Sequence, residues 1–351
     1  MNAIAVERGE TEPSLLDVPE PTPADGEVLL RTLRVGIDGT DFEVLDGNHG
    51  GFPAGDEYQI LGHEAVCAVA DPNGTDLTEG ELVVPTVRRP AEGSHEFFER
   101  GEPDMAPPGT YRERGIEGAH GFMAEFVTTP AEFLVPIPDA FAETGVLIEP
   151  MSNTVKALEL AFASRSLFEW DPERALVLGN GPLGLLTLAM LQPTVERSYC
   201  LGRRDRPDPT IDIIEEFGAT YVDSRTTPVS EIADVHEPMD LVYEATGHAK
   251  HAYDTIDVLA PNGVGVLLGI PSEWTFDIDG GRLHRELVLG NKALLGSVNS
   301  HIRHFESAKE SLETLPDWFL DRIITDVYSP TELEDAFDDS TDCIKQVIDF
   351  T

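Results

Sequence analysis

Four side chains that can hold a metal ion or move a proton follow, or lie within, apolar segments: Asp38, His63, Glu64 and Glu149. An unpaired charge in such surroundings costs free energy, so each of them requires a partner. Imidazole nitrogens and carboxylate oxygens are acceptable zinc ligands, and a catalytic zinc keeps one position open for water or substrate. The metal polarises a hydroxyl group and lowers its pKa, so a hydride can leave the carbon as the proton departs. Spacing alone leaves a second interpretation open, in which the His-Glu pair is structural.

A glycine-rich turn carries the second group of candidate residues. The apolar run 175–178 is followed by Gly179-Asn180-Gly181-Pro182-Leu183-Gly184 and then by an apolar run of helical length. The first glycine permits the turn, the second lets the backbone approach a pyrophosphate, and the third lets the helix pack closely on the strand. The helix N-terminus then faces the phosphates. Strand, turn and helix in this order favour dinucleotide binding over a glycine-rich turn in another βα unit.

The end of the following strand distinguishes between two dinucleotides. The strand expected at 198–201 runs into Gly202-Arg203-Arg204-Asp205. An acidic residue here accepts a hydrogen bond from the ribose 2′-OH of NAD. Arg203 and Arg204 can instead bind a 2′-phosphate through charge-assisted hydrogen bonds, and Gly202 leaves room for it. We predict NADP, with Asp205 as the rival acceptor that would give NAD or dual use.

The elements that must position these residues follow from the hydrophobic pattern. Strand-like runs at 3–6, 27–35, 64–70 and 121–138 indicate a β-rich N-terminal part, interrupted by a polar segment at 85–118. A helix is expected from 152 to about 163. Between 175 and 298 strands alternate with helical patterns, which predicts a parallel, doubly wound sheet. The predicted fold class is α/β.

The charge of the chain restricts its partners. Asp and Glu number 65 and Lys and Arg 24, which gives a net charge of −41 spread over the whole sequence. Such a surface repels nucleic acid and anionic lipid. Dispersed acidity with 41% hydrophobic residues indicates a globular protein of a halophile. The sequence shows no signal peptide and no membrane-spanning run, and its three cysteines are far apart, so we expect a reducing cytoplasm.

The order of the motifs resembles the zinc-dependent medium-chain alcohol dehydrogenase family over essentially the full chain. The matching segments are 36–41, 61–64, 80–84, 149–150, 179–184 and 333–337. Within that family the chain is most similar to the branch that acts on glucose in halophilic archaea, on segments 111–115, 201–205 and 291–299. The resemblance implies a GroES-like β-rich catalytic domain at 1–155, a Rossmann domain at 156–298, and a C-terminal segment at 299–351 that returns to the catalytic domain. It places the active site between the two domains and implies a homo-oligomer, dimer or tetramer.

The resemblance also implies a reaction, in which D-glucose is oxidised at C1 to gluconolactone and hydride passes to NADP. One catalytic zinc is held by Asp38, His63 and Glu149, with Glu64 beside it as a further ligand or acid/base partner. Glu149 and Glu64 also face the sugar. The remaining implied roles are a proton-passing hydroxyl and substrate contact at Thr40, sugar contacts at Glu113 and Asn299, and cofactor contacts at the glycine turn, Arg203, Arg204, Asn291 and Asn299.

Two departures from the family pattern change the expectations. Asp38 stands where most members have a cysteine ligand, and a carboxylate is a harder ligand that weakens zinc affinity or favours exchange with other divalent metals. The lobe 87–115 lacks the four cysteines that hold a structural zinc in many members, so we predict no structural zinc. Four of its residues can hold a cation in principle, but we expect a solvated acidic loop there: His95, Glu96, Glu99 and Asp104.

Two other functions remain open on the sequence. The same chemistry can act on another aldose or a polyol, because sugar epimers differ in one hydroxyl direction. A non-catalytic, NADP-binding redox sensor is the alternative of another class, and the aspartate at position 38 is the only feature that favours it. The retention of His63, Glu64 and Glu149 together favours an enzyme.

Overall fold

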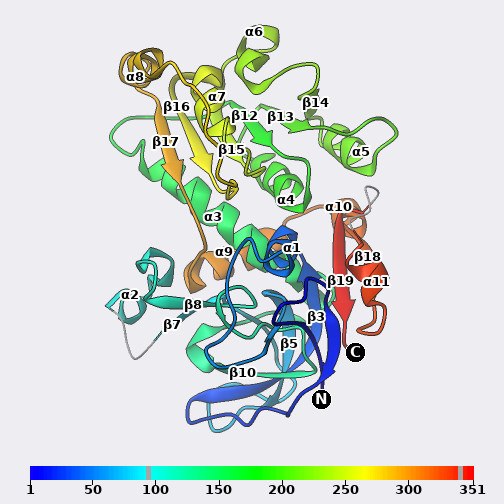
Figure 1. Cartoon of the computed structure of the whole chain (residues 1–351). Coiled ribbons are helices and arrows are strands. Elements are labelled where there is room, and N and C mark those ends of the chain that lie inside the picture. The colour runs from blue at the N-terminus through cyan, green and yellow to red at the C-terminus, as the bar shows by residue number, and fades with distance from the viewer. Residues whose placement is uncertain (92–95, 339–342) are drawn as a thin grey trace. The chain divides into compact units, whose positions relative to one another are not determined.

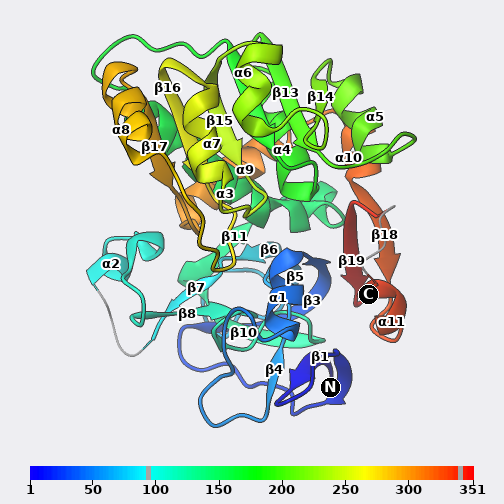
Figure 2. The same ribbon diagram turned by 45° about the horizontal axis from the view of Figure 1, so that its top comes forward.

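The computed structural model describes residues 1–91, 96–338 and 343–351. Within this part of the chain there are two compact units, drawn in Figures 1 and 2. Unit 1 combines Met1–Ser152 with Asn299–Thr351, and unit 2 is Asn153–Val298. In the described residues, no helix is long and apolar enough to cross a bilayer.

Unit 1 is built mainly from strands. In its N-terminal part these are β1 (Asn2–Glu7), β2 (Ser14–Asp17), β3 (Glu27–Ile37), β4 (Tyr58–Ile60), β5 (Glu64–Asp71), β6 (Leu82–Pro85), β7 (Arg88–Pro90), β8 (Tyr111–Arg114), β9 (Gly118–Ala119), β10 (Phe126–Pro130) and β11 (Leu134–Pro136). Between them lie α1 (Gly39–Leu45), α2 (Glu96–Glu99) and short 3-10 turns at η1 (Pro103–Met105), η2 (Ala131–Phe133), η3 (Asp139–Phe141) and η4 (Gly145–Leu147). The C-terminal part adds α9 (Ile302–Leu312), α10 (Asp317–Ile323), β18 (Ile324–Tyr328), α11 (Leu333–Ala336) and β19 (Lys345–Asp349).

The main sheet of unit 1 joins the two ends of the chain. Its strand order is β11-β6-β5-β3-β19-β18, with β10 also pairing with β3. Val347 of β19 lies opposite Gly36 of β3, and Gly36 lies opposite Glu64 of β5. Figure 1 shows the C-terminal β19 beside the N-terminal β3. The last strand of the protein therefore borders the strands that carry the predicted metal ligands.

Unit 2 is a six-stranded parallel sheet with helices in its connections. The strands are β12 (Arg174–Leu178), β13 (Arg197–Gly202), β14 (Thr220–Asp223), β15 (Met239–Glu244), β16 (Leu259–Leu267) and β17 (Ala293–Gly296). The helices are α3 (Ile148–Ala163), which enters from unit 1, α4 (Pro182–Leu191), α5 (Pro209–Glu216), α6 (Ile232–Val235) with η5 (Val229–Glu231), α7 (His251–Val258) and α8 (Gly280–Leu289).

The strand order is β14-β13-β12-β15-β16-β17. Starting from β12, the chain adds strands first on one side and then on the other, as in Rossmann sheets. Residues 175–178 of β12 are all buried, because both faces of a parallel sheet are covered. Figure 1 shows α4 and α5 over the β14 half of this sheet and α7 and α8 over the β17 half. The α/β class and the parallel doubly wound sheet predicted from the sequence are confirmed.

Candidate active site

The turn after β3 places Asp38 against His63. Asp38 caps α1, and its Oδ1 accepts the N–H groups of Thr40 at 2.8 Å and Asp41 at 3.3 Å. Asp41 completes the capping box, because its carboxylate accepts the N–H of Asp38 at 3.1 Å. The same carboxylate accepts the N–H of Gly62 at 3.0 Å. Because Gly62 directly precedes His63, the cap ties the two candidate ligands together. The Oδ2 of Asp38 lies 3.7 Å from the Nε2 of His63.

Gly62 is required where it stands. Its φ is +82°, which L side chains rarely adopt, and a Cβ there would lie 2.6 Å from the side chains of Met123 and Val35. The following residues are His63, directly before β5, and Glu64, which opens it, and they are 4% and 1% exposed. Together with Asp38 they offer ligand atoms that all lie within 4.8 Å of one another.

Glu149 lies near this set without completing it. It is buried at the start of α3 and is not among the described residues that gather within 4.8 Å. Its charge nevertheless helps to raise the pKa of His63. Ser152 fixes the turn by donating to the Glu149 carbonyl at 2.6 Å.

Burial and mutual charge shift the protonation of the set. Burial lowers the pKa of His63, but the carboxylates of Asp38 and Glu149 outweigh it and raise the pKa to about 9. Burial and the Asp38 charge raise the pKa of Asp41 to about 7. Burial also raises the pKa of Glu64. For Asp38 the charge of His63 and backbone hydrogen bonds overcome burial and lower the pKa. When no metal is bound, the raised pKa of His63 favours a protonated imidazole that pairs with the carboxylates around it.

Lys345 is a site residue that the sequence reasoning missed. It is 1% exposed in β19 and forms an ion pair with Glu64 of β5. Strand β3 lies between these two strands, and its Gly36 leaves room for the pair. A Cβ at Gly36 would collide with the Glu64 carboxylate. The available signal was a lysine inside the apolar run Ile344-Lys345-Gln346-Val347-Ile348, in a chain with 24 basic residues.

The residues of this set fit a zinc ion. Across the described ranges, the Nδ1 of His63 is buried without a hydrogen-bond partner. Carboxylate, imidazole and carboxylate are zinc donors, and three protein ligands with an open position characterise catalytic sites. Asp38, His63 and either glutamate can supply such a set. The oxygen-rich composition agrees with the expectation of a harder site than one with a cysteine.

A second pair of predicted residues meets elsewhere in unit 1. Glu113 is 7% exposed, and its Oε1 accepts the side-chain amide of Asn299 at 3.2 Å. The same oxygen accepts the Nε of Arg88 at 2.9 Å, and the Arg88 guanidinium lies 3.8 Å above the Tyr111 ring. Glu113 and Asn299 were predicted as sugar contacts, whereas Arg88 was missed. Thr40 donates its hydroxyl to the Oδ2 of Asp38 at 3.3 Å.

The predicted dinucleotide turn has the required geometry in unit 2. Gly179 has a φ of +116°, and a Cβ at Gly184 would collide with the Gly179 carbonyl oxygen. Among the described residues, no heavy atom lies within 4 Å of a Cβ built at Gly181, so the backbone is open where a pyrophosphate would approach. Pro182 and Leu183 form the first turn of α4, and Asn180 binds Thr210 at 2.6 Å.

The charges after β13 favour a phosphate over a ribose hydroxyl. Arg203 is exposed and Arg204 half-buried, and Arg204 lines a cavity of about 470 Å³ with Tyr221 and Asp205. The rival acceptor, Asp205, is engaged by the guanidinium of Arg225 at 2.7 Å, and this contact lowers the pKa of Asp205. A carboxylate so neutralised repels a phosphate less.

The structure does not place Asn291 with the cofactor residues. Gly179 follows the C-terminal end of β12, an edge that the register continues through Glu244 to Gly296 at the C-terminal end of β17. Asn291 precedes β17, at the opposite edge, with a φ of +48° and an amide bond to Asn262 at 2.9 Å. Dinucleotides bind at the carboxyl edge of such sheets, so the structure does not bring Asn291 close to the other predicted cofactor residues.

A β-rich unit with a buried carboxylate–imidazole set and a Rossmann unit with a dinucleotide turn define a zinc-dependent medium-chain dehydrogenase. Residues 24–139 match the family described as "Alcohol dehydrogenase GroES-like domain" and residues 142–350 the one described as "Glucose dehydrogenase C-terminus". The chain belongs to the glucose dehydrogenase family of these enzymes.

Named relatives support this assignment over the whole length. Glucose 1-dehydrogenase of Haloferax mediterranei is 61% identical, covering 100% of this chain and 99% of its own. Glucose 1-dehydrogenase of Haloarcula marismortui is 59% identical, with coverage of 100% and 99%. A solved Haloferax mediterranei glucose dehydrogenase in complex with NADP, Zn and gluconolactone superposes with a TM-score of 0.99, again with coverage of 100% and 99%. The resemblance predicted from the sequence is confirmed.

Proposed function

We propose that the chain oxidises D-glucose at C1 to gluconolactone and transfers the hydride to NADP, with one catalytic zinc. The observation that carries this conclusion is the buried set of Asp38, His63 and Glu64, in a chain 61% identical to a glucose 1-dehydrogenase. The complex of that relative with NADP, Zn and gluconolactone supports the same substrate class and the same two cofactors. The prediction of an NADP- and zinc-dependent glucose dehydrogenase agrees with these relatives.

The roles of the buried residues combine their contacts with the ligand positions that the family resemblance implies. Asp38, His63 and Glu149 hold the zinc, which when bound polarises the C1 hydroxyl and lowers its pKa. Glu64, whose pKa burial raises, accepts the hydroxyl proton, and Lys345 stabilises the carboxylate before it does so. Thr40 donates to the Oδ2 of Asp38, the oxygen that faces His63, and this contact supports a role for Thr40 in passing the proton onward.

The sugar and the cofactor are held by separate groups. Glu113 accepts a sugar hydroxyl and Asn299 donates to one. Their mutual hydrogen bond of 3.2 Å supports this proposal, because it places an acceptor and a donor side by side. Arg203 and Arg204 bind the 2′-phosphate of NADP, and the N-terminus of α4 faces the pyrophosphate. Asn299 also contacts the nicotinamide half of the cofactor in this proposal.

The assembly and setting of the protein are further proposals. Helix α8 has no buried residues, and its Val288 and Leu289 are 63% and 70% exposed beside the edge strand β17. Exposed apolar residues at a sheet edge support a homo-oligomer, either dimer or tetramer. The charge of −41 supports a halophile cytoplasm, where salt screens the repulsion, and disfavours nucleic-acid and membrane partners. We also propose domain boundaries at residues 155 and 298, with the C-terminal segment 299–351 returning to the catalytic domain.

The substrate is tested by following reduced nicotinamide in molar KCl with added zinc. Glucose, galactose and sorbitol are each offered with NADP and with NAD, and the series is repeated after EDTA. We expect turnover with glucose and NADP that EDTA abolishes. Turnover with galactose or sorbitol alone would keep the chemistry and overturn the substrate. NADP binding without turnover on any sugar would favour the redox-sensor alternative.

A further inference from the structure

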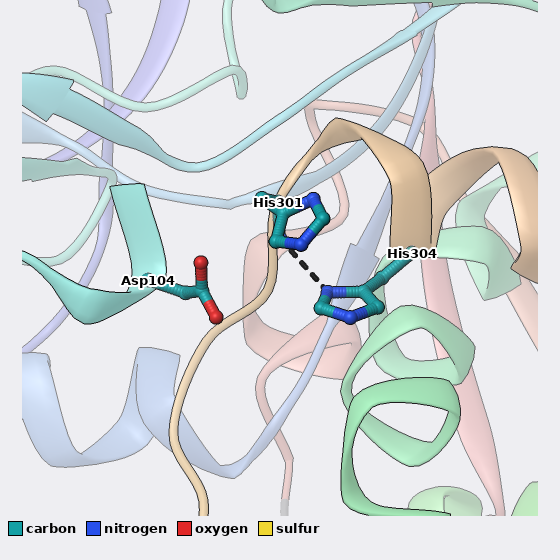
Figure 3. Close-up of side chains that lie close together, drawn as sticks. All are labelled: Asp104, His301 and His304. Atoms are coloured by element: carbon teal, nitrogen blue, oxygen red, sulfur yellow. Dashed lines mark hydrogen bonds between the residues drawn. The ribbon is translucent and has the colours of Figure 1, made fainter. Parts of the chain in front are cut away.

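A second set of metal-binding side chains is buried in unit 1, distinct from the set around His63. Asp104 belongs to η1, and His301 and His304 belong to the start of α9. They are 7%, 8% and 3% exposed, and their ligand atoms all lie within 4.8 Å of one another. Figure 3 shows the carboxylate of Asp104 and the two rings directed toward one another. The expectation of a solvated acidic loop was therefore wrong for Asp104, whereas Glu96 and Glu99 are exposed and His95 lies outside the described residues.

The two rings are fixed by the start of the helix. The Nδ1 of His304 accepts the N–H of His301 at 3.2 Å, and the Nδ1 of His301 accepts the N–H of Arg303 at 3.3 Å. The rings lie with their centroids 3.9 Å apart. Both hydrogen bonds are longer than the usual 2.9–3.0 Å, so they hold the ring nitrogens less strongly than most such bonds.

Both ring nitrogens of His301 lie close to polar groups of Arg303. The Nε2 lies 3.4 Å from the guanidinium, and the Nδ1 accepts the backbone N–H at 3.3 Å. Neutral imidazole is the form that binds metal ions.

We propose that Asp104, His301 and His304 bind one zinc ion, separate from the catalytic one. Two imidazoles and a carboxylate are suitable zinc ligands, and a water can take the fourth position. The site uses a donor set different from the four cysteines whose absence led to the prediction of no structural zinc. The ion would fasten the lobe that contains η1 to helix α9, although these elements are far apart in sequence.

The same site supports the residues proposed to bind sugar. The Nη1 of Arg88 donates to the carbonyl of Asp104 at 2.9 Å, and its Nε donates to Glu113, which in turn binds Asn299. Asn299 is two residues before His301. A zinc ion at the second site therefore holds both ends of this chain of hydrogen bonds, a consequence that rests on the proposed function.

The test is the zinc content of the purified full-length protein after dialysis in molar KCl with excess Mg²⁺, which occupies surface carboxylates. We expect about two zinc ions per chain in the wild type, and about one each in His63→Ala and in Asp104→Asn. His304→Gln is a second variant of the same site, and His284→Gln, an exposed histidine of α8, is the matched control that keeps two. Far-UV circular dichroism checks that each variant is folded.

Three results would overturn the proposal. These are one zinc or none in the wild type, two in folded Asp104→Asn and His304→Gln, or a loss of zinc in the His284→Gln control. The wild-type count stands even if a variant does not fold. Zinc titrated into metal-free His63→Ala should bind at least about tenfold more tightly than into the same chain with Asp104→Asn added.

The link to the sugar has its own readout. In Asp104→Asn we expect the KM for glucose to rise several-fold while kcat and the KM for NADP change little. If the wild type binds the second zinc but Asp104→Asn leaves the KM for glucose unchanged, the link to the sugar is wrong and the metal site stands. If the protein has no glucose activity at all, the zinc count still decides the proposal.

Discussion

The set around His63 and the turn around Arg204 contain the same kinds of charged side chains at different degrees of burial. The side chains of Glu64 and Lys345 are 2% and 1% exposed, whereas those of Asp205 and Arg225 are 84% and 38% exposed. In the buried set, desolvation and close charges shift the pKa values of Asp38, Asp41 and Glu64. They also raise the pKa of His63 to about 9. At the turn, water and salt screen the charges. Burial, more than the number of charges, therefore decides which substitution has a large effect.

The largest expected effect comes from removing the imidazole of the buried set. His63→Ala should lose the catalytic zinc, and kcat/KM should fall about a thousandfold or more, because a metal contributes several kcal/mol to stabilising the charge that develops on the substrate oxygen. Steady-state kinetics with metal analysis checks this. His284→Ala should leave both unchanged, and residual activity of His63→Ala within tenfold of the wild type would contradict the role of His63.

Breaking the buried ion pair should mainly reduce stability. Lys345→Met leaves the Glu64 charge without its partner in a dry site, and we expect a loss of about 3–5 kcal/mol of unfolding free energy. Lys345→Met combined with Glu64→Gln should regain much of it, because no unpaired charge remains. Denaturant unfolding of the metal-free chains in molar KCl measures both. Equal stability of wild type and Lys345→Met would show that the pair is not buried as described.

Removing the two arginines of the turn should change cofactor choice without changing chemistry. In Arg203→Ala combined with Arg204→Ala we expect the KM for NADP to rise about tenfold or more, while the KM for NAD stays nearly constant. Arg285→Ala in α8 is the exposed control. A parallel loss with both cofactors would indicate a general electrostatic effect instead of phosphate recognition.

The buried set should also make the metal-free protein less stable as pH rises. The folded-state pKa of His63, about 9, lies above its ordinary value of 6.5, so its contribution is complete below pH 6.5 and is lost as pH rises through about 9. Asp41 acts in the same direction as pH rises through about 7. We expect the Tm of EDTA-treated protein to fall between pH 6.5 and 9, with a smaller fall after zinc is restored. A rising Tm over this window would contradict the assigned shifts.

The smallest effect is expected at the exposed pair. Arg225→Ala frees Asp205, which can then repel the 2′-phosphate and accept the ribose hydroxyl of NAD. Because the pair is exposed and screened, we expect the preference for NADP over NAD to fall only a few-fold. Competition kinetics with the two cofactors measures the ratio. An increase in NADP preference would show that Arg225 does not act through Asp205.

The features that the sequence predicted are those encoded by neighbouring residues. The Gly179–Gly184 turn lies between its own strand and helix, so local pattern was sufficient there. For His63 and Glu64, at the start of β5, spacing left the role open and the family resemblance assigned it. Lys345 and Arg88 reach their partners through β-sheet pairing and side-chain packing between distant segments, which no local pattern reports. Asp104 could be noted as a cation ligand from the lobe, but its histidine partners lie on α9. The strand predicted at 293–298 is observed at Ala293–Gly296, and its local pattern does not report that Asn291 lies at the edge away from the glycine turn.

The most direct test of the central claim is anomalous X-ray diffraction at the zinc edge from crystals grown with zinc. The account predicts a peak in every chain between the Oδ2 of Asp38 and the imidazole of His63, within coordination distance of both. Crystals that contain bound zinc but show no peak at these two residues would contradict it, because the buried set would then be a network of ion pairs and not a metal centre.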